Sequence, residues 1–322
     1  MQTSRWLNEN NESQLVNRLV TMTRSTKLSV NILCVGAAVV DFVYYLDALP
    51  TRPEKYGTER ADIVGGGCAA NAAVAVSRLG GRATLAARMG DDPMGDLILG
   101  DLKAEGVDVS NISRTQGGRS SYSSVAIDPS GERQIVNFRG SGLTFDTVWF
   151  ERLTEVSAVL TDTRRVAAAI AAMQLARRLN VPGIVDGEAP IDPGILEEAS
   201  HVALSMQGLR SLVPVGAIDD ALVQMKSRFG GWFCVTDGAN GVHYTHGGAV
   251  EHCPAFPVEA VDTLGAGDVW HGAFALALAE GQEAPGAIRF ASAAAALKCT
   301  RLGGRAGTPT RSEVLEFMSG AL

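Results

Sequence analysis

The sequence has no stretch of about 20 uncharged apolar residues, so it predicts no membrane-spanning helix. It also has no excess of basic residues, because 28 Lys and Arg stand against 35 Asp and Glu, for a net charge of −7. This balance argues against nucleic acid as the main partner, but it allows a local basic site for a small anion. The 322 residues are 46% hydrophobic, enough for the core of one large α/β domain.

The cysteines form no pattern that is typical of a metal or disulfide site. There are five of them, and no pair has Cys-x-x-Cys spacing. We therefore expect a reduced, cytoplasmic protein. Residues 1–30 are polar and lack the apolar core of a signal peptide, so we expect a flexible extension there and a single domain over residues 31–322.

Short apolar runs alternate with helical segments along most of the chain. Buried strands are predicted at residues 158–161, 183–186, 202–205 and 232–236, and a helix at residues 165–179. A further apolar run begins at Ile32. Alternation of this kind predicts a mostly parallel sheet covered by helices on both faces.

Half-polar strands are predicted in two other regions. Residues 54–63 alternate between polar and apolar, and residues 120–128 and 133–138 flank a Pro-Ser-Gly turn. We expect these regions, about 42–63 and 118–139, to form a small β-sheet lid that stands off the main body. An exposed sheet edge and face invite association, so a homodimer is expected.

The most informative segment is the run DTLGAGD, residues 262–268, which leads into an apolar helix. Gly265 and Gly267 allow backbone N–H groups to converge, and a helix N-terminus adds further donors and positive dipole. Such a turn can bind an anion. Asp268 beside it makes sense if the anion is transferred and an alcohol needs a base. The competing interpretation is an aspartate that only caps the helix.

A second glycine-rich segment covers residues 64–81 and leads into a helix with Asn71 in its first turns. A dinucleotide-binding loop, and with it a nicotinamide-dependent oxidoreductase, is the competing interpretation. That loop follows the first strand directly, whereas these glycines come about thirty residues after it.

Together, the two segments resemble the signatures of the ribokinase-like (PfkB-type) carbohydrate kinases. The resemblance covers residues 32 to about 317 and implies a ribokinase-like three-layer α/β/α sandwich that uses ATP and Mg²⁺ on a small sugar. It implies that Asp268 is the catalytic base and that the backbone of Gly265, Ala266 and Gly267 forms the anion site. It also implies sugar contacts from Asp41, Gly66, Gly67 and Asn71.

The nucleotide side carries a weaker pattern. Residues 235–242, VTDGANGV, resemble the family's loop under the ATP phosphates and ribose, with Thr236 and Gly238 as contacts and Gly241 shaping the turn. By itself this segment is only a hairpin turn. The small-residue helix at 290–300 suits either an adenine wall or plain core. Many relatives carry Asn-x-x-Glu near the metal site, whereas residues 205–208 are Ser-Met-Gln-Gly here. Ketohexokinase-like members also lack the motif, so its absence does not exclude activity. The metal ligands are therefore unassigned.

Three segments, residues 49–67, 132–138 and 290–309, resemble the branch that contains the 6-deoxy-6-sulfofructose kinases. In those kinases Lys55, Asn137 and Arg164 match positions that hold the sulfonate. One ammonium, one guanidinium and one amide suit a singly charged anion, whereas a phosphate dianion would need more positive charge. The alternative acceptors are fructose, a ketose phosphate or a 2-keto-3-deoxy sugar acid. Lys55 and Arg164 could instead be ordinary surface cations. A non-catalytic sugar sensor on the same fold is a separate alternative, which the intact DTLGAGD disfavours.

Overall fold

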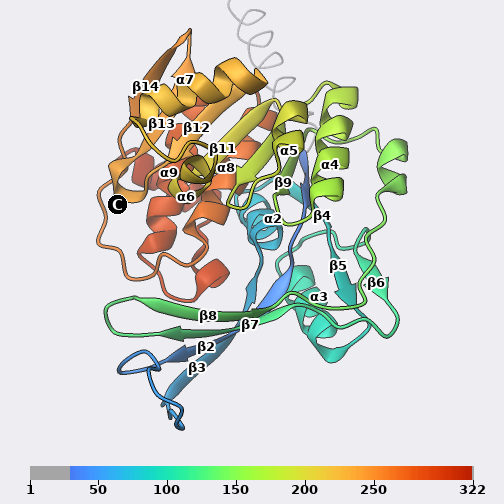
Figure 1. The fold of residues 1–322 in the computed structure, drawn as a ribbon, viewed down its shortest axis with the longest axis vertical. Coiled ribbons are helices and arrows are strands. Elements are labelled where there is room, and N and C mark those ends of the chain that lie inside the picture. Colours follow the sequence, from blue (N-terminus) through green and yellow to red (C-terminus); the bar gives the residue numbers. More distant parts are fainter. Residues whose placement is uncertain (1–29, 321–322) are drawn as a thin grey trace, which may run out of the picture. The chain divides into compact units, whose positions relative to one another are not determined.

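The computed structural model describes residues 30–320 (Figure 1). The extension expected over residues 1–30 lies outside the described residues, apart from Val30. The central sheet has eight strands in the order β14-β13-β12-β11-β10-β9-β1-β4. The six from β12 to β4 are parallel, and β13 and β14 are antiparallel to their neighbours. The predicted mostly parallel sheet is confirmed.

The strands of this sheet are β1 (Asn31–Val35), β4 (Arg82–Ala86), β9 (Ala158–Asp162), β10 (Gly183–Gly187), β11 (His201–Ser205), β12 (Trp232–Thr236), β13 (Val242–His246) and β14 (Ala249–Cys253). The strands β9 and β10 bury all of their residues, as expected where helices cover both faces. One face carries α2 (Cys68–Arg78), α8 (Ala266–Ala279), α9 (Ala284–Cys299) and α10 (Arg311–Met318). The other carries α4 (Val166–Leu179), α5 (Pro193–Glu198), α6 (Met206–Leu212) and α7 (Ile218–Phe229). The three layers are those predicted.

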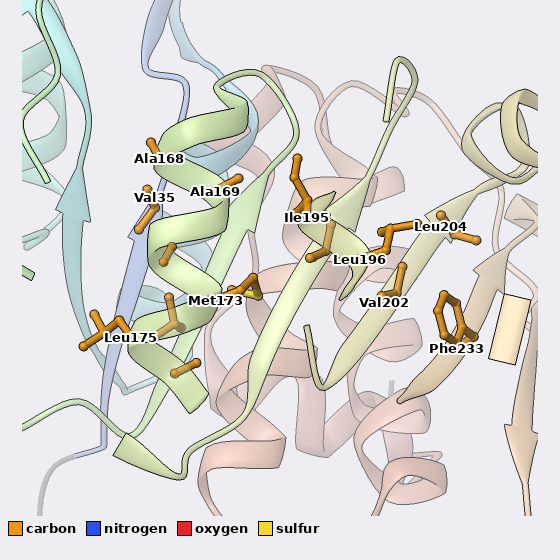
Figure 2. Close-up of a cluster of buried hydrophobic side chains, with 14 of the residues drawn as sticks. Val35, Ala168, Ala169, Met173, Leu175, Ile195, Leu196, Val202, Leu204 and Phe233 are labelled. Carbon is orange, nitrogen blue, oxygen red and sulfur yellow. The ribbon is translucent and has the colours of Figure 1, made fainter. Parts of the chain in front are cut away.

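The hydrophobic core between the sheet and the α4–α7 layer is shown in Figure 2. Ala169 and Met173 of α4 belong to the same buried cluster as Val202 of β11 and Phe233 of β12. Each large apolar side chain buried in this way contributes about 1.5–3 kcal/mol. The helix α4 ends at Asn180, which adopts the left-handed conformation with φ of 53°. This core fixes the carboxyl ends of the strands that carry the site.

A second sheet of four strands stands off the main body (Figure 1). Its order is β3 (Arg60–Gly66), β2 (Val39–Tyr45), β7 (Tyr122–Ile127) and β8 (Arg133–Phe138). The hairpin β7–β8 was predicted within two residues. The predicted strand at residues 54–63 is wrong in its first part, because the strand begins at Arg60 and residues 54–59 are exposed. A segment with alternating polar and apolar side chains forms a strand only where those side chains pack against a neighbouring surface.

The apolar run from Ile32 is divided between the two sheets. The strand β1 lies in the central sheet and β2 in the lid, with Gly36 at the change of direction. Gly36 has φ of +148°, and a Cβ there would overlap the carboxylate of Asp162 at the end of β9. That carboxylate accepts a hydrogen bond of 2.6 Å from the N–H of Ala37. The lid therefore starts at the carboxyl edge of the sheet, where ligands bind in open α/β folds.

The remaining elements connect these parts. The strands β5 (Arg88–Gly90) and β6 (Ser113–Thr115) form a small parallel pair, and α3 (Pro93–Ala104) begins where Asp92 caps Gly95. The 3₁₀ helices are η1 (Val148–Arg152), η2 (Gly238–Asn240) and η3 (Gly304–Gly307). Over residues 30–320, no helix combines the length and apolar character needed to cross a bilayer.

Candidate active site

Two cavities lie at the carboxyl edge of the central sheet. The first, called the lid cavity, has a volume of about 410 Å³ and is bounded by one face of the lid. The second, called the helix cavity, has a volume of about 580 Å³ and is lined by η2 and α9. Leu264 lines the lid cavity, whereas Ala266 and Gly267 line the helix cavity. The turn before α8 therefore stands between the two cavities.

That turn has the geometry of an anion site. Gly265 adopts the left-handed conformation with φ of +77°, which glycine favours, and α8 begins at Ala266. The N–H of Ala266 donates to Thr263 O at 3.2 Å, and its predicted role at the anion stays a prediction. The N–H groups of Gly267 and Asp268 have no acceptor among residues 30–320. Because nothing lies within 4 Å of a Cβ at Gly267, an anion can approach these two amides.

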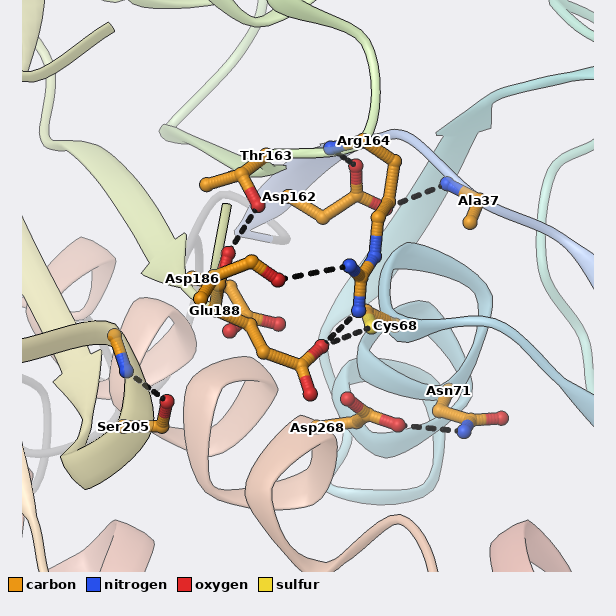
Figure 3. Close-up of polar contacts among 12 residues, drawn as sticks. Ala37, Cys68, Asn71, Asp162, Thr163, Arg164, Asp186, Glu188, Ser205 and Asp268 are labelled. Carbon is orange, nitrogen blue, oxygen red and sulfur yellow. Dashed lines mark hydrogen bonds and ion pairs between the residues drawn. The ribbon is translucent and has the colours of Figure 1, made fainter. Parts of the chain in front are cut away.

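Asp268 is half-buried beside this turn, and Figure 3 shows its carboxylate facing Asn71. The Nδ2 of Asn71 donates to Asp268 Oδ2 at 2.6 Å. The aspartate bonds to no amide of α8, so the helix-cap interpretation is wrong. The pKa of Asp268 is raised to about 7, because burial and the charge of Asp186 raise it by more than Asn71 and His271 lower it. A carboxylate with a pKa near neutrality suits general-base chemistry.

Asp186, at the end of β10, is a second buried carboxylate in the site. Atoms of Asp186, Asp268 and Cys68 lie within 4.8 Å of one another. Asp186 is only 7% exposed and accepts no hydrogen bond from the described residues, and His271 Nδ1 lies 3.6 Å away. Burial, with the charges of Asp162 and Glu188, raises the pKa of Asp186 to about 8. An unpaired buried carboxylate of this kind is costly unless a ligand supplies positive charge.

The segment at residues 205–208 has a structural role. Ser205 caps α6 by accepting a hydrogen bond of 2.9 Å from the N–H of Gly208 (Figure 3). A Cβ at Gly208 would overlap the backbone oxygen of Gly187. There is thus no room at residue 208 for the glutamate of the Asn-x-x-Glu pattern. The carboxylates of Asp186, in β10, and of Glu188, just after it, lie near Cys68 instead.

The lid cavity contains several of the predicted sugar contacts. Asp41, Ser123 and Asn137 share one face of the lid because they are paired in register across β2, β7 and β8. Asp41 and Asn137 line the cavity, as does Gly67. Gly66 is not among the lining residues, and a Cβ there would overlap Asp41.

Two predicted contacts lie elsewhere. Lys55 is on the exposed segment before β3 and lines neither cavity. Asn71 is buried and is held between Asp268 and Arg305, outside the lining of both cavities. The sugar contacts predicted for Lys55 and Asn71 stay predictions.

Four arginines line the lid cavity, and the sequence indicated only one of them. Arg164 forms an ion pair with Glu188 and donates to Ala189 O at 3.3 Å (Figure 3). The others are Arg88, Arg139 and Arg165, for which no ion pair is found among residues 30–320. Arg139 follows Asn137 by two residues, and this period of two was the signal that could have revealed it.

The helix cavity contains the predicted nucleotide contacts. Thr236, Gly238 and Gly241 line it, as do Ser292 and Ala296 of α9. Gly241 has φ of +97°, and a Cβ there would overlap Cys253 O, so glycine is required at this turn. The residues that α9 contributes to the lining have small side chains. The loop expected under the ATP phosphates and the helix expected beside the adenine therefore line one cavity.

Comparison with known proteins gives the family. A sequence profile described as pfkB family carbohydrate kinase matches residues 30–311. The ribokinase of Bacillus subtilis (strain 168) is 30% identical over 90% of this chain and 99% of its own length. The chain belongs to the pfkB family of carbohydrate kinases. This membership excludes the oxidoreductase alternative.

Other relatives agree with this assignment. The fructokinase of Solanum tuberosum is 27% identical over 90% of this chain and 96% of its own. A crystal structure of a candidate ribokinase from Agrobacterium tumefaciens has 38% identity and a TM-score of 0.87, covering 91% and 98% of the two chains. The predicted ribokinase-like fold is confirmed. This pfkB-family protein is an ATP-dependent carbohydrate kinase that uses ATP with Mg²⁺.

Proposed function

We propose that this kinase phosphorylates the C1 hydroxyl of a ketose that carries an anionic group at its far end, with 6-deoxy-6-sulfofructose as the leading substrate. The supporting observation is the lid cavity, which is lined by four arginines and also by a carboxylate and an amide that suit sugar hydroxyls. In a protein with a net charge of −7, such a cluster of guanidinium groups favours an anionic substrate.

In this proposal Asp268 takes the proton from the attacking hydroxyl. The free N–H groups of Gly267 and Asp268, together with the N-terminus of α8, stabilise the charge on the transferred phosphoryl group. The lid excludes water while the sugar hydroxyl and the γ-phosphate are held in line. ATP occupies the helix cavity, with Thr236 and Gly238 at its phosphates and Gly241 shaping the turn.

The residues around Asp186 fit a magnesium ion. Mg²⁺ prefers oxygen ligands, and the buried Asp186 carboxylate lacks a hydrogen-bond donor from the described residues. Asp186 would hold the ion together with nucleotide phosphates and water, whereas the thiol of Cys68 is a poor ligand for it. When bound, the ion neutralises charge on the phosphates.

A ketose phosphate is the second candidate substrate. The sequence indicated one guanidinium, and a phosphate dianion needs more positive charge than one guanidinium and one ammonium supply. Arg88, Arg139 and Arg165 supply it, and each lines the lid cavity without an ion-pair partner among the described residues. Arg164, in contrast, already faces Glu188. This observation favours fructose 6-phosphate as strongly as the sulfonated sugar.

The test is a panel of ribose, fructose, fructose 6-phosphate and 6-deoxy-6-sulfofructose, with ATP consumption as the readout. We expect kcat/KM to be highest for an anionic ketose, and Arg139→Ala to raise KM for that sugar far more than for fructose. Highest activity on ribose or fructose, with no effect of Arg139→Ala on the ranking, would contradict an anionic substrate. No turnover of any sugar in the panel would contradict the proposed function as a whole.

We also infer that the kinase is a homodimer formed through the lid. The lid face opposite the cavity carries Ile63, Tyr44 and Val136, which are 62%, 37% and 71% exposed. Ile63 and Val136 lie in one row across the sheet, since both align with the Phe42–Ser124 pair. Exposed apolar side chains gathered on one sheet face favour association.

A further inference from the structure

Arg305, in η3, is buried among residues of the site without lining either cavity. It is 3% exposed and uses all three of its nitrogens. Nε donates to Asn71 Oδ1 at 2.9 Å, Nη1 to Asp101 Oδ2 at 2.7 Å and Nη2 to Gly66 O at 2.8 Å. The side chain thus connects α2, α3 and the end of β3.

The glycine loop, residues 65–67 at the end of β3, leaves space for the guanidinium of Arg305. A Cβ at Gly65 would overlap the guanidinium of Arg305 and the carboxylate of Asp101. The absence of a side chain at residue 65 is therefore explained by Arg305, and not by contact with the sugar. The loop and the arginine form one packed unit behind Asn71.

The arginine determines which way the amide of Asn71 faces. A guanidinium has donors only, so the Asn71 atom that faces Nε must be the carbonyl oxygen. The amide nitrogen then faces Asp268 Oδ2, to which it donates at 2.6 Å. A reversed amide would direct its oxygen at the ionised carboxylate, and the two would repel each other. With Oδ2 held by Asn71, the other oxygen of Asp268 remains for the substrate hydroxyl.

We propose that Arg305 is a positioning residue for phosphoryl transfer, which fixes Asn71 so that its amide nitrogen holds the carboxylate of Asp268. This inference rests on the proposed role of Asp268 as the base. Arg305 touches no reacting atom in this account, and it acts only through Asn71.

A matched control is present in the same region. Arg78 holds η3 and the residue after it, donating to Glu105 at 2.7 and 2.6 Å, to Ala306 O at 2.8 Å and to Thr308 O at 2.9 Å. It has a similar number of partners but does not contact Asn71 or Asp268. Loss of Arg78 therefore removes structural support without changing the amide of Asn71.

The experiment is a double-mutant cycle on kcat, with ATP-Mg²⁺ and whichever sugar of the four-member panel gives the highest kcat/KM. We expect Arg305→Met and Asn71→Ala each to lower kcat by about 10- to 100-fold while KM for ATP changes little. The kcat of the double variant should be no lower than that of the less active single variant, because both changes remove the same interaction. Arg305→Lys should keep the fold and recover part of kcat.

Arg78→Met should lower the Tm but change kcat by less than about threefold, and its effect should add to that of Asn71→Ala. If the effects of Arg305→Met and Asn71→Ala multiply, or if Arg305→Met behaves like Arg78→Met, Arg305 is structural only.

A second cycle needs no sugar: Arg305→Met should lower the Tm less in the Asp268→Asn background than in the wild type, whereas Arg78→Met should lower it equally in both. Equal losses for Arg305→Met would overturn the inference even if no sugar is turned over.

Discussion

At Asp268, burial and hydrogen bonding act on the carboxyl group in opposite directions. Burial and the nearby Asp186 disfavour the ionised form, whereas the Asn71 amide and His271 favour it. The result is a pKa of about 7, at which the carboxyl is divided between acid and base at physiological pH. A weaker base would be ionised but inert, and a fully protonated one could not accept a proton.

The first prediction concerns the pH dependence of the reaction. Only ionised Asp268 can accept a proton, so kcat/KM should rise about tenfold per pH unit below 7 and level off above it. Asn71→Ala removes a hydrogen bond that lowers this pKa, and the rise should then move to higher pH. The measurement is kcat/KM for the sugar from pH 5.5 to 9. A profile that shifts to lower pH in Asn71→Ala would contradict the assignment.

The second prediction concerns Asp268→Asn. Turnover should fall by roughly 10²–10⁴-fold, with sugar affinity nearly unchanged, because the amide keeps the shape but cannot take a proton. The same variant should alter stability with a definite sign. The folded pKa is raised above 3.8, so the aspartate's contribution to stability is present below that pH and is lost as pH rises through about 7.

Asp268→Asn should therefore raise the Tm relative to the wild type more at pH 8 than at pH 4. Thermal unfolding in a series of buffers checks this, since it needs no substrate. A variant that retains full turnover would falsify the base assignment, whatever its Tm.

Residues were predictable from the sequence where the local chain determines their position. Asp268 and Gly265 lie in one turn, and Thr236, Gly238 and Gly241 lie in another. The arginines of the lid cavity were missed because residues 88, 139 and 165 come together only through the carboxyl edge of the sheet and the face of the lid. Arg305 contacts Asn71 across 234 positions, which no local pattern indicates.

Among the elements, the change from β1 to β2 decides where the lid stands. The chain leaves the central sheet at Gly36, against the carboxylate of Asp162 at the end of β9. The Asp162 carboxylate accepts from the N–H of Ala37 at 2.6 Å and from that of Arg164 at 2.9 Å. This one side chain therefore holds both the start of the lid and the segment that carries Arg164 and Arg165.

The third prediction tests this arrangement with Gly36→Ala. The new methyl group would overlap Asp162 and would sit at a φ of +148°, so we expect a loss of at least about 1–3 kcal/mol in unfolding free energy. The sugar's KM should rise as well, because the lid and the arginine segment shift. The control is Gly57→Ala in the loop before β3, where a Cβ meets nothing within 4 Å. Chemical denaturation should show little change for Gly57→Ala, and equal losses in the two variants would contradict the account.

Buried strands were predicted from the sequence to within one or two residues, because continuous apolar runs are typical of a sheet covered on both faces. The division of the run after Ile32 was not predictable, since both halves are apolar and the partner of Gly36 lies 126 positions away. The late start of β3 at Arg60 has a similar cause. Alternation gives the period of a strand, but its length depends on a neighbour that the local sequence does not reveal.

At the scale of the whole molecule, the two cavities meet at a single turn. The lid cavity lies under β2, β7 and β8, and the helix cavity lies against η2 and α9. The turn before α8 belongs to both, so a sugar hydroxyl and a nucleotide phosphate can approach the same two amides from opposite sides. This arrangement follows from the fold, because parallel strands end at one edge and the lid rises from that edge.

The fourth prediction concerns the far face of the lid. Strand pleating sends Asp41, Ser123 and Asn137 toward the cavity, and it therefore sends Ile63 and Val136 to the opposite face. If that face is a dimer interface, the double variant Ile63→Glu/Val136→Glu should be a monomer by size-exclusion chromatography with light scattering. A buried like-charge pair at the interface would cost several kcal/mol.

The matched control is Val215→Glu, since Val215 is 80% exposed on the segment between α6 and α7, away from the lid. It should leave the oligomeric state unchanged. A wild-type protein that is monomeric at the same concentration would exclude the dimer. A double variant that stays dimeric would move the interface elsewhere. The cavity face belongs to the same four-stranded sheet, so monomerisation should also raise the KM for the sugar. The KM for ATP should stay nearly constant, because the helix cavity includes no residue of the lid.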